Sequence, residues 1–212
     1  IDDRTANDPA PTKIPAGALE FDIHKLGKVK KVALDVATAV CTILWENGTQ
    51  AYFFIPAEGN GGYFRFEHLP DTLSPALVAP LYQGRITESD RQPGVNDLSA
   101  LGYPSGAITS PAPGRLLYRQ QAWGDVSYEI ALQWKQPRTG VLEGGYNVTS
   151  KGTWYSEDAD AANHSDADLD EALASHRNWW ERYWKQSSIT LPDSTAIYYW
   201  GIMSKKEMTG AL

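Results

Sequence analysis

The stretch CTILWENGTQAYFFI (residues 41–55) decides the fold class, because it holds two apolar runs that are separated by a turn. Apolar and aromatic residues fill 41–45 and 50–55, as they do in strands that are buried in a β-sheet. Asn47 and Gly48 stand between the runs, and both residues tolerate the positive φ that a type I′ turn requires. We therefore predict a β-hairpin with a type I′ turn at Asn47 and Gly48.

Strand patterns continue on both sides of this hairpin. Apolar residues alternate with polar ones, or form short apolar runs between turns, at 19–24, 32–36, 63–69, 77–82, 107–109, 114–123, 127–134 and 144–155. No helical period appears before residue 165, and the single cysteine, Cys41, fits a small core residue of one strand. The chain is therefore predicted to be mainly β, as an antiparallel β-sandwich.

A helical pattern begins after the last predicted strand. Ser165 can cap a helix, and Asp166 and Asp168 supply negative charge to its first turn. Large side chains then recur at three- and four-residue spacing, namely Leu169, Ala172, Leu173, His176, Trp179, Trp180, Tyr183 and Trp184. So much aromatic surface on one stripe has to be covered. We expect a helix at about 166–186 that packs against the sandwich, a neighbouring chain or a second helix.

The patterns divide the chain into four parts. They are an extended N-terminal arm at 1–16, a β-sandwich domain at 17–156, a linker with the aromatic helix at 157–192, and the start of a second helical domain at 193–212. Asp193 can cap that second helix. The chain begins at Ile1 rather than methionine, as expected after removal of a signal peptide or after trimming, and the second helix is expected to be truncated.

Charge and hydropathy exclude two classes of partner. The 212 residues carry a net charge of −7, and the longest basic run is Lys30-Lys31 beside Lys28. Nucleic-acid binding needs a basic face, so we expect no nucleic-acid partner. No apolar run approaches the roughly 20 residues that cross a bilayer, so we expect no membrane span.

Two stretches of the chain match sequence patterns of one known protein family. One is LDVATAV (residues 34–40), followed by the hairpin and its aromatic return strand, in which YFF (residues 52–54) replaces the family's usual Arg-Glu. The other is HRNWWERYW (residues 176–184), followed by SSITLPD (residues 187–193) and by Tyr198-Tyr199. The first stretch resembles the amino-terminal domain of glycoside hydrolase family 95. The second is similar to the linker of that family, which leads into an alpha/alpha six-hairpin barrel.

The resemblance implies a non-catalytic supersandwich domain that scaffolds the following barrel, which would hold the catalytic carboxylate. The parent protein would then be a bacterial glycoside hydrolase that acts on an oligo- or polysaccharide outside the cytoplasm, in the periplasm or secreted. Its partners would be the downstream barrel and, through the parent enzyme, a carbohydrate. No catalytic residue is expected in this chain.

The acidic residues agree with that expectation. Glycoside hydrolysis needs two carboxyl groups about 5 Å or about 6.5–9.5 Å apart. Asp97, Asp125, Glu129 and Glu143 are candidates, but no spacing brings two of them together, so solvated surface is the better interpretation. The acidic stretch at 157–160 lacks the spacing of an EF-hand, and the four histidines share no zinc-ligand spacing. We expect no cofactor and no metal.

Three aromatic residues, Trp123, Trp154 and Tyr155, offer an alternative function. Flat rings can form a platform for a sugar, although aromatic residues of a sandwich also fill its core. If they do form a platform, the chain would be a stand-alone carbohydrate-binding module. The leading hypothesis remains the scaffold domain.

Overall fold

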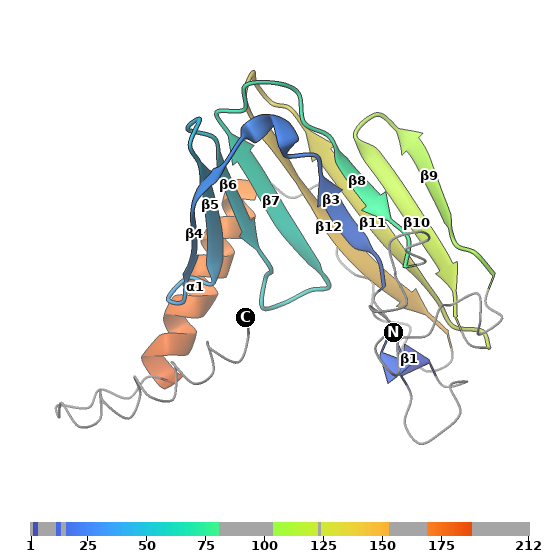
Figure 1. Cartoon of the computed structure of the whole chain (residues 1–212). Helices are drawn as coiled ribbons and strands as arrows, with labels where there is room; N and C mark the ends of the chain where they lie inside the picture. Colours follow the sequence, from blue (N-terminus) through green and yellow to red (C-terminus); the bar gives the residue numbers. More distant parts are fainter. Residues whose placement is uncertain are drawn as a thin grey trace.

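The computed structural model describes residues 16–80, 104–122, 124–152 and 169–187, and the backbone of residues 2–3 and 12–13. It is mainly β and antiparallel, which confirms the predicted sandwich class (Figure 1). The strands are β1 (Asp2–Asp3), β2 (Thr12–Lys13), β3 (Ala18–Phe21), β4 (Val29–Asp35), β5 (Val40–Trp45), β6 (Gln50–Phe54), β7 (Gly61–Glu67), β8 (Pro75–Val78), β9 (Ala107–Ala112), β10 (Arg115–Gln121), β11 (Ser127–Lys135) and β12 (Leu142–Lys151).

The main sheet has eight strands in the order β4-β5-β6-β7-β12-β11-β10-β9. It consists of two four-stranded meanders, β4 to β7 and β9 to β12, which join where β7 pairs with β12. Gly144 lies at this junction, and a Cβ atom there would lie 2.7 Å from the Phe64 ring and closer still to the carbonyl oxygen of Gln133. Glycine is therefore required for the two meanders to approach each other.

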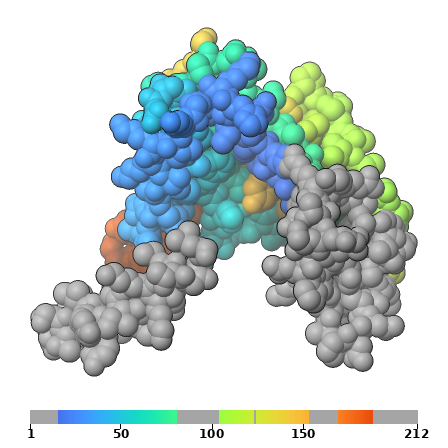
Figure 2. All heavy atoms as spheres, viewed as in Figure 1, coloured from blue at the N-terminus to red at the C-terminus, as the bar shows by residue number. Residues whose placement is uncertain are grey.

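A second, smaller sheet covers one face of the main sheet. Strands β3 and β8 pair across the front of the larger sheet, and the following 3-10 helix η1 (His24–Leu26) continues over its upper edge (Figures 1 and 2). Phe21 of β3 lies 5.0 Å from Phe64 and 4.9 Å from Phe66, measured between ring centroids. The core lies between these layers, where alternate residues of the main sheet are buried.

The helix α1 (Leu169–Ser187) lies against the opposite face of the main sheet, behind β4, β5 and β6 in Figure 1. Leu169, with Ala172 and Leu173, packs against Val40, Phe54 and Tyr63 of the sheet. The prediction that the aromatic helix packs on the sandwich is therefore confirmed. Its first described residue is Leu169, and the predicted cap at Ser165 lies outside the described residues.

The hairpin between β5 and β6 is present, but the predicted type I′ turn is wrong. Gly48 has φ of 90°, whereas Asn47 does not adopt a positive φ. Trp45 donates to the carbonyl oxygen of Thr49 at 2.9 Å, so the loop comprises three residues, 46–48. The Asn47 side chain instead accepts a hydrogen bond from the Thr49 amide at 2.9 Å, which stabilises this longer turn.

Within the described part of the chain, no helix is long and apolar enough to cross a membrane. The N-terminal arm at 1–16 contributes one short ladder, in which β1 and β2 pair antiparallel. The expected second helical domain at 193–212 lies outside the described residues.

Candidate functional site

The last turns of α1 pack against the turn between β4 and β5. Asp35 organises this turn, because its carboxylate accepts hydrogen bonds from the Thr38 hydroxyl at 2.7 Å and from the Ala37 amide at 3.0 Å. The same two interactions, in that order, hold the pKa of Asp35 below its ordinary value. Ala39 has φ of 48°, a conformation that costs a non-glycine residue free energy and persists only where the surroundings hold it.

The last turns of α1 bind this turn. The indole nitrogen of Trp184 donates a hydrogen bond to the backbone carbonyl of Val36 at 3.1 Å. About two turns earlier in the helix, His176 lies beside Phe54, with the centroids of the two rings 4.9 Å apart. The two stretches 34–40 and 176–184, which are far apart in the sequence, thus lie against each other.

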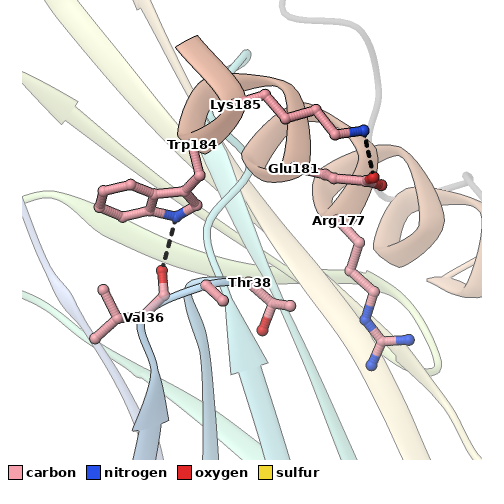
Figure 3. A pocket seen from close by; sticks show the side chains of 7 residues that line it. Val36, Thr38, Arg177, Glu181, Trp184 and Lys185 are labelled. Carbon is pink, nitrogen blue, oxygen red and sulfur yellow. Dashed lines mark hydrogen bonds and ion pairs between the residues drawn. The ribbon is translucent and has the colours of Figure 1, made fainter. Parts of the chain in front are cut away.

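An open hollow of about 700 Å³ lies between the turn and α1. Val36, Ala37 and Thr38 line one side, and Trp184 and the aliphatic parts of its charged neighbours line the other (Figure 3). Lys185 donates to Glu181 at 2.7 Å along the helix, so these two charges balance each other at the rim. The Val36 side chain is 62% exposed, which leaves a predominantly apolar surface facing outward.

The aromatic stripe of α1 divides into two groups. Trp179, Trp180 and Trp184 are half-buried and His176 is buried, and Trp184 reaches the sheet through its hydrogen bond to Val36. Trp179 and Tyr183 stack on each other, with ring centroids 5.4 Å apart and an interplanar angle of 10°, and Tyr183 is 40% exposed. The sheet therefore leaves Tyr183 partly exposed, and its i, i+4 stacking on Trp179 covers part of its surface within the helix. The other expected cover, a second helix at 193–212, lies outside the described residues.

A partly buried ion-pair network links the start of α1 to the sheet. Arg65 of β7 donates to Glu143 of β12 at 2.9 Å and to Asp170 of α1 at 2.7 Å. Lys135 of β11 approaches Glu143 from the other side at 3.2 Å. Burial alone would lower the pKa of Arg65, but its hydrogen bonds to Asp170 and Glu143 outweigh burial and raise it. The same contact with Arg65 lowers the pKa of Asp170.

His176 is the buried titratable group between α1 and the sheet, with 3% of its surface exposed. Burial lowers the pKa of His176, and the nearby backbone of Thr38 and Ala39 offsets only part of this effect. Arg177 is the charged neighbour, and it lowers the pKa further. Neither ring nitrogen makes a hydrogen bond of normal geometry with the described residues. The neutral imidazole is therefore the form that fits this site.

Acid should weaken the docking of α1 through His176. The ordinary pKa is 6.5 and the folded-state pKa is lower, so below pH 6.5 the unfolded chain binds more protons than the folded one. We expect the free energy of unfolding to fall with decreasing pH through this range, by at most about 1.4 kcal/mol per pH unit. Urea unfolding of the parent and of His176→Phe, at about pH 7.5 and about pH 5.5, measures the difference.

The His176→Phe variant should lose this part of the pH dependence, because phenylalanine does not titrate. His24 is exposed, so His24→Phe is the matched control and should behave like the parent. An equal pH dependence in His176→Phe and the parent would contradict the role assigned to His176.

A second hollow, of about 460 Å³ and lined by polar residues, lies on β10, β11 and β12. Strand register places six of its eight lining residues in two rows across the three strands: Arg119, Glu129 and Thr149 form one row, and Gln121, Ser127 and Lys151 form the next. Gln120 and Tyr128, which pair with each other between these rows, complete the lining. Arg119 and Glu129 form an ion pair. Residues two apart in a strand share a face, so all six side chains belong to the face opposite the core residues Tyr118, Tyr128 and Ile130.

The four candidate carboxylates do not form a catalytic pair among the described residues. Asp125 is exposed, and Asp97 lies outside the described residues. Glu129 and Glu143 share one face of the sheet, but six residues of strand separate their rows, which is about 20 Å. That distance exceeds the separation that either glycosidase mechanism uses.

Glu143 corrects one interpretation of the sequence. It was expected on the solvated surface, but it is 8% exposed and ion-paired with Arg65 and Lys135. The alternation in 142–146 contains glycines that hide which face Glu143 occupies. Arg65 was not singled out from the sequence at all, because an arginine within an aromatic strand gives no sign of its two partners.

The predicted platform residues Trp123, Trp154 and Tyr155 lie outside the described residues. Their sequence neighbours do belong to the polar hollow. Trp123 stands in the connection between Gln121 and Ser127, and Trp154 follows Lys151 by three residues. The described residues contain no group of three or more histidine, cysteine or acidic side chains that could hold a metal ion.

Comparison with known proteins identifies no relative: no protein-family model, no curated protein and no solved structure matches this chain.

Proposed function

We propose that this chain is the non-catalytic β-sandwich domain of a glycoside hydrolase, and that it scaffolds a following helical domain. The observation that carries the proposal is the apolar hollow between the 35–39 turn and the last turns of α1. It lies where α1 ends at Ser187 and the chain continues toward the apolar residues Ile197 and Trp200. A tether of about ten residues can reach about 33 Å, so the hollow is within range of that segment.

The surroundings of the hollow support a docking role. Trp179 and Tyr183 present a partly exposed aromatic surface on the same helix, and edge strand β4 exposes Val32 and Leu34 nearby. Exposed apolar surface that is contiguous over several residues is typical of an interface. The two stretches of sequence that resemble family 95 are also the two that line this hollow. Their contact favours the proposal that the parent protein is a glycoside hydrolase.

Docking can be tested with the whole chain. Ala37→Glu places a charge on the apolar side of the hollow, and the Ala37 side chain is exposed, so the sandwich should stay folded. We expect amides of residues 193–212 to exchange with deuterium at least about tenfold faster in Ala37→Glu than in the parent. Thr109→Glu, on the exposed strand β9, is the matched control and should leave the exchange unchanged.

Two results would count against the scaffold function. One is exchange of residues 193–212 that is identical in the parent and in Ala37→Glu. The other is hydrolysis of aryl glycosides by the isolated chain that disappears in Glu129→Gln or Glu143→Gln. The first result would exclude docking in the hollow, and the second would show that this domain is itself catalytic.

The second candidate function is a carbohydrate-binding module, and the polar hollow on β10, β11 and β12 favours it. Its volume falls in the range of small-molecule sites, about 300–1,000 Å³. The segments that carry Trp123 and Trp154 leave the sheet from its lining strands.

A further inference from the structure

We propose that the polar hollow binds an acidic saccharide, with Lys151 bound to the carboxylate of a uronic acid unit. This inference rests on the carbohydrate-binding function and is independent of the docking of α1. The two rows of polar side chains, which strand register places side by side, would form the binding surface.

The arrangement of these side chains suits a ligand with many hydroxyl groups. Three adjacent strands span about 10 Å, and the rows are about 7 Å apart, so six polar groups lie within the length of a short oligosaccharide. Each row mixes donors with acceptors: a guanidinium, a carboxylate and a hydroxyl in one, an amide, a hydroxyl and an ammonium in the other. A hydroxyl group both donates and accepts, so neighbouring hydroxyls can bridge such alternating partners.

The hydrogen bonds already made within the hollow leave some donors and acceptors of its side chains for a ligand. The Gln121 amide nitrogen already donates to the carbonyl oxygens of Gly124 and Val126, at 3.0 and 2.9 Å. Its amide oxygen is therefore the group that a ligand would meet. The Glu129 carboxylate is held by Arg119, which fixes its position and leaves further lone pairs to accept hydroxyl groups.

The balance of charge selects the acidic class of saccharide. Among the lining residues, Arg119 is neutralised by Glu129, and Lys151 adds one positive charge. The chain as a whole carries −7, so this single excess positive charge is local to the residues that line the hollow. A sugar carboxylate at Lys151 would form a charge-assisted hydrogen bond, which is roughly twice as strong as a neutral one.

The test uses the whole chain and affinity electrophoresis in native gels. The acidic probe is polygalacturonate, and the neutral probes are xylan and hydroxyethyl cellulose. We expect polygalacturonate to retard the parent chain more than either neutral polymer. Lys151→Ala should weaken this retardation by about tenfold in apparent affinity, the loss of one charge-assisted contact.

Lys30→Ala is the matched control, because it removes the same charge from β4 at the other edge of the sheet. It should bind polygalacturonate like the parent. Equal weakening by both variants would show non-specific attraction and overturn the proposed site. Retention by the neutral polymers alone would overturn the acidic ligand while keeping a carbohydrate function, and retention by none would exclude both. The scaffold function is tested separately by hydrogen exchange.

Discussion

Replacing Arg65 by alanine is expected to lower the free energy of unfolding by about 3 kcal/mol, because it leaves a buried carboxylate without its main partner. The Arg65 side chain is 19% exposed and binds both Glu143 in the sheet and Asp170 in α1. Removing it breaks the ion pair with Asp170, which joins α1 to the sheet, and the ion pair with Glu143, which lies within the sheet. Urea unfolding followed by tryptophan fluorescence measures the loss.

Two further variants separate the causes of this effect. Asp170 is 71% exposed, so Asp170→Asn should cost only about 0–1 kcal/mol. The double variant Arg65→Met with Glu143→Leu removes both buried charges and should recover most of the stability. If Arg65→Ala loses less than about 1 kcal/mol, Arg65 does not compensate the buried charge of Glu143.

Replacing Trp180 by alanine is expected to cost about 3 kcal/mol, the lower end of the range for a large aromatic side chain. Full burial of the stripe would predict about 3–5 kcal/mol, but Trp180 is half-buried. Its ring contacts Trp179 and Tyr183, with centroids 5.1 and 5.3 Å apart, and lies 6.3 Å from His176. A loss of about 3 kcal/mol should lower the melting temperature by about 6–12 °C.

Tyr183→Ala is the control for this prediction, because Tyr183 is 40% exposed and stacks on Trp179 within the helix, so its loss should cost about 1 kcal/mol. Trp180→Phe should keep most of the stability, since it retains a ring and removes an indole nitrogen that makes no hydrogen bond in the described structure. Melting of both Trp180→Ala and Trp184→Ala within about a degree or two of the parent would show that α1 is not docked.

These two predictions differ in how far the sequence anticipates them. The spacing of Leu173, His176 and Trp180 predicts a helix with one apolar side, and α1 packs through that side. The local pattern does not reveal which surface covers that side. The turn at 35–39, against which α1 packs, lies about 140 positions earlier in the chain. Arg65 is invisible in the sequence for the same reason: its importance comes from Glu143 and Asp170, which neighbour it only in the folded chain.

The candidate sites show the same division. The sequence offers Trp123, Trp154 and Tyr155 as flat rings near turns, and these three residues lie outside the described part of the chain. The polar hollow on β10, β11 and β12 is not predicted from the sequence, although its residues Arg119, Glu129 and Lys151 can all be read there. Only the register of β10, β11 and β12 brings these residues into adjacent rows, and a shift of one residue would move them to the other face.

Local patterns predict most of the strands, their alternation and a helix that carries the aromatic residues of 169–186, because these features depend on residues that are two to four positions apart. The tertiary structure alone decided that β7 pairs with β12, that β3 and β8 form a separate layer, and that Glu143 is buried. It also decided the three-residue turn after Trp45, where Thr49 is buried and donates to the carbonyl oxygen of His68 at 3.0 Å. Such features depend on contacts between distant segments, whose free energies local patterns do not record.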